Sequence, residues 1–348
     1  PQIINSNDWQ CALIPVYYSI FYRNDEKLWG IKNVFTIHNI QYQGRYGMEI
    51  LEDVLGIPKH FASLMEYDRD INLMKAAIEV SDKVTTVSPT YAREILDPWF
   101  SHGLDRALAD KQYKTCGFLN GIDTDMYNPA TDPAIPANFT VTKKAGKKTC
   151  TQKLLEEVGL PQGDEPVLGM VSRLVEHKGF DLVKCVFDDI INLGYKVVIL
   201  GSGEAQYEQF FHEMRWKYPD RVAFTCGYIP DLAKKIYAGA NMFLMPSKFE
   251  PCGLGQMIAM RYGAVPIVRE TGGLKDTVEA FNPVTQKGNG FTFKAYQAYD
   301  MLDAVWRTLG TYFDKNLWKK VQSNAMKCDF SWKRSAKEYL DIYKEITK

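Results

Sequence analysis

The sequence has no net charge, because 42 lysines and arginines balance 42 aspartates and glutamates. This balance excludes a protein that binds nucleic acid through bulk charge, although it does not exclude a local basic site. No apolar run approaches the roughly 20 residues that a membrane helix needs, and residues 1–30 carry no basic stretch followed by an apolar one. We therefore expect a soluble, unexported protein with no nucleic-acid or membrane partner.

The sequence also lacks paired cysteines. Its seven cysteines are Cys11, Cys116, Cys150, Cys185, Cys226, Cys252 and Cys328. They are widely scattered with no C-x-x-C pair, whereas disulfide frameworks and zinc sites need paired counts or short spacings. We expect free thiols in a reducing compartment and no metal.

Apolar, β-rich runs alternate with helical patterns along the whole chain, as in a parallel sheet covered by helices. The second half predicts strands at 167–171, 196–200, 221–226, 241–245 and 264–268, and helices at 180–193, 206–218, 231–238 and 253–262. The first half predicts strands at 3–4, 34–37, 83–87 and 118–119, and helices at 12–21 and 71–81. The predicted class is α/β, with two doubly wound domains facing each other across a hinge.

The stretch 128–148 contains three prolines and no periodicity, which indicates a linker. We therefore predict a first domain over 1–135, a second over 136–328 and a C-terminal helix over 329–348. Only three or four strands are visible in the first half, fewer than the usual five or six. We expect the first domain to be incomplete in this chain.

Ligands of open α/β sheets bind at the carboxyl ends of the strands. The loop 171–179 follows a strand there and carries Arg173 and Lys178, five residues apart. Such a pair suits a diphosphate, with the arginine as a fork and the lysine as a point charge. Taken alone, the Arg173 and Lys178 pair is explained equally well as exposed charges in a polar loop.

Two glycine pairs also follow strands. Thr271-Gly272-Gly273 lets backbone N–H groups approach a phosphate at a helix start, although a plain turn would explain it too. Gly201-Ser202-Gly203 lacks the third glycine of a dinucleotide fingerprint.

The loop 246–254 places Glu250 between a strand and a glycine-opened helix. Its carboxylate can accept hydrogen bonds from sugar hydroxyls, although by itself an acid favoured by the helix dipole is the better explanation. Ser247 and Cys252 flank it, and Cys252 would be reactive if the helix lowered its pKa. Tyr228 follows another strand and suits either a nucleotide base or the core.

In the first half, His38 follows the strand 34–37 and Asp8 lies beside Trp9 in another strand-end loop. A single histidine is more often structural than catalytic. Asp123-Thr124-Asp125 has the D-x-D pattern that binds a metal–nucleotide complex in some glycosyltransferases. It lies in an Asn-Gly turn, so we interpret it as turn chemistry.

Together these loops resemble the bacterial glycogen synthase and starch synthase family, retaining glucosyltransferases of the GT-B fold. The motifs that carry the resemblance are residues 7–10, 36–40, 42–44, 87–91, 119–123, 172–174, 178–179, 246–254, 271–274 and 329–332. The resemblance implies transfer of glucose from ADP-glucose to an α-1,4-glucan with retention, without a metal or cofactor. The resemblance also implies that the C-terminal helix over 329–348 returns to the first domain. The family opens with a Lys-x-Gly-Gly-Leu loop that nothing here matches.

The resemblance also implies roles for the residues. Arg173, Lys178 and the amides of Gly272 and Gly273 would stabilise the departing diphosphate. His38 and Asp8 would lie at the reacting sugar, and Glu250 would hold glucose hydroxyls. The remaining donor-binding residues would be Thr271, Ser247, Cys252, Gly253, Leu254, Tyr228 and Asn120. The leaving phosphate would help to deprotonate the acceptor, with a double displacement as the alternative.

Two positions refine the resemblance. Asn5 stands where relatives usually carry a histidine, and it cannot titrate. Ile258 stands where many retaining GT-B enzymes carry a glutamate, which this family commonly lacks. The alternatives are another retaining GT-B enzyme, of the sucrose or trehalose-phosphate type, and a non-catalytic glucan-binding homologue. Glycogen or starch as product, cytoplasm or plastid as location, and the oligomeric state all stay open.

Overall fold

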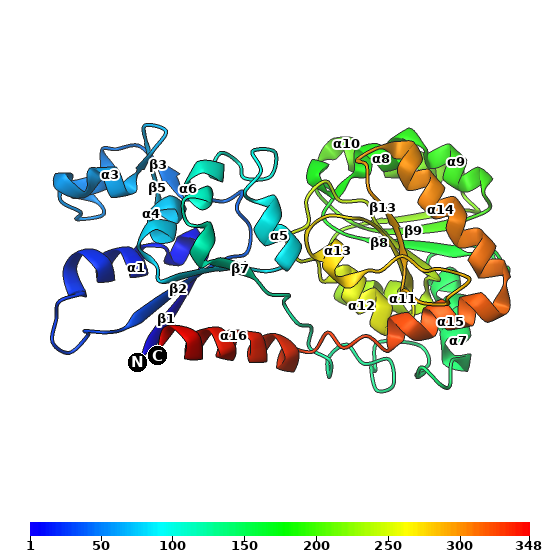
Figure 1. The fold of residues 1–348 in the computed structure, drawn as a ribbon. Helices are drawn as coiled ribbons and strands as arrows, with labels where there is room; N and C mark the ends of the chain where they lie inside the picture. The colour runs from blue at the N-terminus through cyan, green and yellow to red at the C-terminus, as the bar shows by residue number, and fades with distance from the viewer. The chain divides into compact units, whose positions relative to one another are not determined.

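The computed structural model describes residues 1–348 and divides into two compact units (Figure 1). Unit 1 comprises residues 1–120 and 333–348, and unit 2 comprises residues 121–332. The chain therefore passes between the units after Asn120 and after Trp332, whereas the sequence suggested 135 and 328. Inside unit 2 the two crossing segments pair, because the Ile122 amide donates to the Phe330 carbonyl at 2.8 Å.

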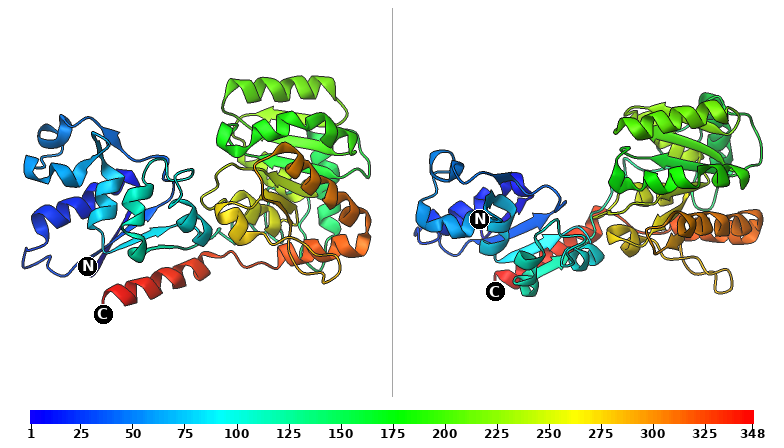
Figure 2. Two further views of the ribbon diagram at one scale, coloured as in Figure 1. Left: turned by 45° about the horizontal axis from the view of Figure 1, so that its top comes forward. Right: turned by 90° about the horizontal axis from the view of Figure 1, so that it is seen from above.

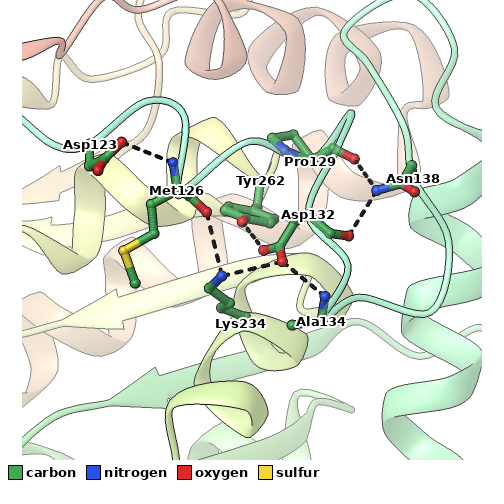
Figure 3. A network of polar contacts seen from close by, with 8 residues as sticks. All are labelled: Asp123, Met126, Pro129, Asp132, Ala134, Asn138, Lys234 and Tyr262. Atoms are coloured by element: carbon green, nitrogen blue, oxygen red, sulfur yellow. Dashed lines mark hydrogen bonds and ion pairs between the residues drawn. The ribbon is translucent and has the colours of Figure 1, made fainter.

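Residues 121–135 belong to unit 2 because polar contacts fasten them there (Figure 3). The carboxylate of Asp132 is buried, accepts a hydrogen bond from the Tyr262 hydroxyl and lies 3.2 Å from Lys234 Nζ. Arg261 donates to the carbonyls of Thr124 and Tyr127 at 2.9 and 2.6 Å. A segment without periodicity is thus held by tertiary bonds, which a sequence pattern does not reveal.

The end of the predicted linker is also structured, because helix α7 spans Ala145–Glu157. Its Lys147 is 4% exposed, and Nζ donates to the carbonyls of Ala238, Ala240 and Tyr262, each at 2.9 Å. A buried lysine is paired in this way, but its sequence signature is that of a solvated helix face. The linker interpretation was wrong for this stretch.

Unit 2 is built on a parallel six-stranded sheet in the order β10-β9-β8-β11-β12-β13. The strands are β8 (Val167–Val171), β9 (Lys196–Gly201), β10 (Val222–Cys226), β11 (Met242–Met245), β12 (Val265–Arg269) and β13 (Phe291–Phe293). From β8 the chain adds β9 and β10 on one side of the sheet. It then adds β11, β12 and β13 on the other side. The five predicted strands and the doubly wound arrangement are confirmed, and the three-residue β13 was missed.

Helices cover both faces of this sheet (Figure 2). They are α7, α8 (Phe180–Cys185), α9 (Phe187–Asn192), α10 (Ala205–Lys217), α11 (Pro230–Gly239), α12 (Gly255–Arg261), α13 (Gly272–Thr277), α14 (Ala298–Phe313) and α15 (Lys315–Met326). The helix predicted at 180–193 breaks at Val186. Phe180, Phe187 and Phe211 pack edge to face in the core beneath these helices.

Unit 1 has a parallel four-stranded sheet in chain order, β1-β2-β6-β7, and a small antiparallel sheet, β3-β5-β4. The strands are β1 (Ile3–Asn7), β2 (Lys32–Ile37), β6 (Lys83–Thr86), β7 (Thr115–Gly117), β3 (Arg45–Tyr46), β4 (Glu66–Tyr67) and β5 (Asp70–Asn72). The helices are α1 (Leu13–Tyr17), α2 (Ile50–Asp53), α3 (Ala62–Met65), α4 (Leu73–Val80), α5 (Pro89–Glu94), α6 (Asp105–Ala109) and α16 (Trp332–Ile346). The predicted helix 12–21 ends early, because Tyr18–Tyr22 (η2) is π-helical. The predicted strand at 118–119 was displaced, since β7 ends at Gly117.

Helix α16 is bound to the unit 1 sheet by Asn5. The amide nitrogen of Asn5 donates to the Tyr343 hydroxyl at 2.9 Å, and its oxygen accepts from Thr36 Oγ1 at 3.1 Å. The rings of Phe118 and Tyr339 pack at 5.4 Å between centroids. Both ends of the Asn5 side chain are therefore used in joining α16 to β2.

None of the helices described above combines the length and the apolar character that crossing a membrane requires.

Candidate active site

In the unit 2 sheet the order in which strands are added reverses between β8 and β11. Ligands of open α/β sheets bind outside the carboxyl ends of the strands at such a point. The loop after β8 contains Arg173 and Lys178, and the loop after β11 contains Glu250. The two loops touch, because the Lys248 amide donates to the His177 carbonyl at 2.9 Å.

Lys178 and Glu250 form an ion pair between these two loops. Lys178 Nζ lies 2.7 Å from Glu250 Oε2, and the Ser247 hydroxyl donates to the same oxygen at 3.0 Å. The side chains are 17% and 8% exposed, so both charges are largely removed from water and depend on each other. Both bonds end on Oε2, which leaves Oε1 available to accept from a ligand.

Close approach of the two loops requires Gly179. This residue adopts a left-handed conformation with φ +79°, and a Cβ there would lie 2.1 Å from the Pro246 carbonyl oxygen. Only glycine combines that backbone with that contact. Gly201 and Gly203 are similar, since their Cβ atoms would meet the carbonyls of Ser172 and Leu174 at 2.0 and 2.3 Å. The G-x-G sequence therefore serves close packing of the β8 loop.

The Gly272-Gly273 pair also has a packing role. The Gly273 amide donates to the carbonyls of Glu250 and Pro251 at 3.1 and 3.2 Å, so the structure already pairs it. A Cβ on Gly272 or Gly273 would lie 2.0 Å from the Glu250 oxygen or 1.9 Å from the Cys252 oxygen. The pair holds the Glu250 loop against α13, and the phosphate contact expected of its amides stays a prediction.

The other expected donor-binding residues near Glu250 in the sequence and at the start of α13 are mostly buried. Ser247, Thr271 and Cys252 are buried, and Leu254 is 46% exposed. Gly253 has φ +72°, and a Cβ there would lie 3.0 Å from Glu250 Cγ. Sequence reasoning missed Gln256, whose amide donates to the carbonyls of Cys252 and Gly253 at 3.1 and 2.9 Å. Its only signal was a polar residue beside the apolar run 257–260 of α12.

Arg173 and Tyr228 line a neighbouring pocket of about 240 Å³, together with Gly201, Gly227 and Ile229. Tyr228 is 89% exposed, so its alternative interpretation as a core residue was wrong. Burial, reinforced by the positive charges of Lys178 and Arg173, lowers the pKa of His177. This ring is therefore neutral at pH 7, and Arg173 and Lys178 supply the cationic charge here.

In unit 1, Asp8 fixes the backbone of His38. Asp8 Oδ1 accepts from the amides of His38 and Asn39 at 2.8 and 3.4 Å, and the His38 Nε2 atom lies 2.9 Å from Asn7 Oδ1. Asp8 itself has φ +55° and ψ 177°, a strained conformation for a residue with a side chain. The structure brings these two expected residues together at the carboxyl ends of β1 and β2.

The remaining motif residues belong to the scaffold. Gln43 donates to the carbonyls of Ile40 and His102, and Asp123 Oδ1 accepts from the amides of Asp125 and Met126. The Asp123 bonds confirm the interpretation of D-x-D as turn chemistry. Asn120 is half-buried at the last position of unit 1 before the chain crosses. No three His, Cys, Asp or Glu side chains gather as a metal-binding group would.

Comparison with known proteins identifies two family models. The starch synthase catalytic domain matches residues 1–110, and glycosyl transferases group 1 matches residues 152–322. Glycogen synthase of Anoxybacillus flavithermus is 47% identical over 349 residues, covering 99% of this chain and 72% of that protein. Glycogen synthase of Clostridium acetobutylicum is 45% identical over 353 residues, covering 99% and 73%.

Solved structures agree with this result. The catalytic domain of starch synthase IV from Arabidopsis thaliana, bound to ADP and acarbose, is 35% identical with a TM-score of 0.91. The match covers 100% of this chain and 73% of that one. Sucrose-phosphate synthase from Thermosynechococcus elongatus is 18% identical with a TM-score of 0.62, and the match covers 99% of this chain and 73% of that one. This likeness shows a common fold and nothing more.

Proposed function

Because the chain belongs to the glycogen synthase and starch synthase family of retaining GT-B glucosyltransferases, we propose that it transfers glucose from ADP-glucose to the non-reducing end of an α-1,4-glucan. The observation that carries the site assignment is the Lys178–Glu250–Ser247 cluster at the reversal point of the unit 2 sheet. Incubating the protein with ADP-glucose and glycogen, and measuring glucose incorporated into polymer, tests the activity. Absence of incorporation in a folded protein that carries the full family length would overturn it.

The charges of unit 2 suit the departing nucleotide. Cleavage of the glucose–phosphate bond leaves negative charge on the diphosphate, which fixed donors stabilise. Lys178 has three N–H donors, of which one serves Glu250, so two are left for phosphate oxygens. Arg173 adds a planar fork from the same loop as Lys178. No proton has to move for either residue to act.

Glu250 would act on the sugar. Its Oε1 accepts a hydrogen bond from a glucose hydroxyl, while its negative charge favours the cationic character that the sugar develops in the transition state. Lys178 and Ser247 hold the carboxylate in place for this. Retention would follow from a front-face reaction in which the leaving phosphate takes the acceptor proton.

The residues of unit 1 would serve the acceptor and the reacting sugar. Asp8 holds the amides of His38 and Asn39, and thereby fixes the backbone of His38 and the direction of its carbonyl. The structure supports a positioning role for Asp8 in addition to the expected place at the sugar. A cytoplasmic location is part of the proposal, and the seven free thiols support it.

We expect the reaction to need no divalent metal. Arg173 and Lys178 provide the positive charge that a metal would otherwise bring to the diphosphate. Activity in EDTA should stay within about twofold of the untreated protein, with added magnesium as the control. Activity abolished by EDTA and restored by magnesium would contradict this prediction.

We also expect ADP-glucose to be preferred over UDP-glucose. The pocket of about 240 Å³ beside Arg173 exposes the Tyr228 ring, and a purine covers more of an aromatic ring than a pyrimidine does. The ratio of kcat/KM values should favour ADP-glucose by about tenfold or more. Tyr228→Ala should narrow that ratio, and a native preference for UDP-glucose would refute the donor assignment.

A further inference from the structure

The segment after β13 contains an aromatic ring that has two cations beside it. Tyr296 is half-buried, and its ring centroid lies 5.5 Å from Arg269 Cζ and 5.8 Å from Lys248 Nζ. Cations in this position are attracted by the electrons of the ring face. Neither Tyr296 nor Arg269 lies in the sequence motifs that carry the family resemblance.

Arg269 ends β12 and holds the loop that contains Glu250. Its Nη1 atom donates to the Lys248 carbonyl at 2.8 Å, and its Nε atom donates to the Lys294 carbonyl at 3.2 Å. The rigid plane of a guanidinium, with several divergent N–H donors, suits such a bridge. The side chain therefore joins the segment after β13 to the backbone two residues before Glu250.

The Tyr296 hydroxyl fastens the ring to the other loop of the site. It donates to Asp181 Oδ1, and Asp181 lies in the first turn of α8, three residues after Lys178. Burial, reinforced by the bond to Asp181 and its charge, raises the pKa of Tyr296, so the hydroxyl keeps its proton at pH 7 and remains a donor. The two loops are thus connected through Tyr296, one by its hydroxyl and the other by Arg269 on its face.

The geometry of the Lys178–Glu250 pair depends on the separation of these loops. The pair closes at 2.7 Å, and a backbone bond from the Lys248 amide to the His177 carbonyl at 2.9 Å links the loops directly. Tyr296 provides a second connection between them. A misplacement of about 1 Å at reacting groups can cost about 10²-fold in rate, even when the altered residue lies away from the chemistry.

We propose that Arg269 and Tyr296 are positioning residues, which set the separation of the Lys178 and Glu250 loops and thereby the rate of transfer. The inference rests on the proposed function, because it assigns these residues to the transfer step. Neither side chain has to touch the donor or the glucan. Their alteration should therefore lower kcat and leave the KM for ADP-glucose nearly unchanged.

The first test compares two tyrosines that each donate to an aspartate. Tyr296→Phe keeps the ring and loses the bond to Asp181, whereas Tyr218→Phe loses a bond of 2.8 Å to Asp188. Tyr218 precedes β10 and so lies toward the amino-terminal ends of the strands, away from the site. Tyr296→Phe should lower kcat by about tenfold with the KM for ADP-glucose within about twofold, and Tyr218→Phe should behave as the parent.

The second test compares two arginines that each donate to a loop carbonyl. Arg221 donates to the Gly194 carbonyl at 3.1 Å, directly before β10, so Arg221→Lys is the control. Arg269→Lys keeps a cation beside Tyr296 but lacks the planar fork that reaches two carbonyls. Arg269→Ala should lower kcat by about 10²-fold, Arg269→Lys by about tenfold, and Arg221→Lys not at all.

A double variant shows whether the effect passes through the Lys178–Glu250 pair. Adding Tyr296→Phe to Glu250→Gln should lower the remaining kcat by no more than about threefold, because residues that act as a unit are not additive. A merely structural role would instead multiply the two losses. Thermal unfolding of every variant accompanies the kinetics, and Tyr296→Phe decides the question if Arg269→Ala does not fold.

Tyr296→Phe and Arg269→Lys proteins with kcat within twofold of the parent would overturn the positioning role and leave the proposed function intact. A raised KM at constant kcat, equal losses in the two control variants, or multiplied losses in the double variant would also overturn it. A folded parent of full family length that transfers no glucose would overturn the proposed function, and this inference with it.

Discussion

Lys178→Ala should lower kcat by about 10²–10³, equivalent to about 3–4 kcal/mol, because it removes a fixed donor aimed at developing negative charge. Arg173→Ala should lower kcat by a similar factor. Lys178→Arg should restore kcat only in part, since a planar guanidinium does not replace a compact ammonium between Glu250 and a phosphate. Steady-state kinetics of the full-length enzyme measure these effects. Lys275→Ala, at an exposed position of α13, is the matched control and should behave as the parent.

The structure adds a complication to the Lys178 experiment. Its removal leaves Glu250 buried without a cation, and breaking a buried pair typically costs stability by about 3–5 kcal/mol. Thermal unfolding of each variant therefore has to accompany the kinetics. Arg173 has an exposed side chain, so its loss should leave the unfolding temperature unchanged. Folded Arg173→Ala and Lys178→Ala proteins with kcat within a fewfold of the parent would refute the electrostatic role.

Glu250→Gln should reduce kcat by about 10²–10³ while changing KM for the donor much less. Glutamine keeps the shape and the bond from Ser247, but it removes the charge that favours a cationic sugar in the transition state. The result would separate transition-state stabilisation from simple binding of glucose. Glu213→Gln, at an exposed position of α10, is the control. A rise in KM at constant kcat would show that Glu250 only binds the ground state.

The sequence was sufficient for five of the six strands of unit 2 and for most of the loops at their ends, because fully buried parallel strands are long apolar runs. Lys178 and Glu250 could be named from their loops, but their pairing could not, since they lie 72 residues apart. Gly273 illustrates the opposite case. Glycine permits a phosphate contact and close packing equally well, and its packing against the Glu250 carbonyl becomes visible only in the structure.

Residues 121–135 illustrate a different limit. Prolines and missing periodicity are typical of linkers, yet here Asp132 is buried against Tyr262 and Lys234. Long-range polar bonds leave no periodic trace along the chain. The same holds for Asn33, whose unsatisfied oxygen is visible only once its neighbours are placed.

The assignment of α16 to unit 1 has a consequence for biosynthesis. Unit 1 is discontinuous, and its last part, residues 333–348, follows the whole of unit 2 in the chain. Domains generally fold in order of their emergence from the ribosome. Here the partners of Tyr343 and Tyr339, which are Asn5 on β1 and Phe118 directly after β7, must wait uncovered until unit 2 has been translated. The unit that is started first is therefore completed last, and a nascent chain halted before α16 would present an unfinished sheet to chaperones.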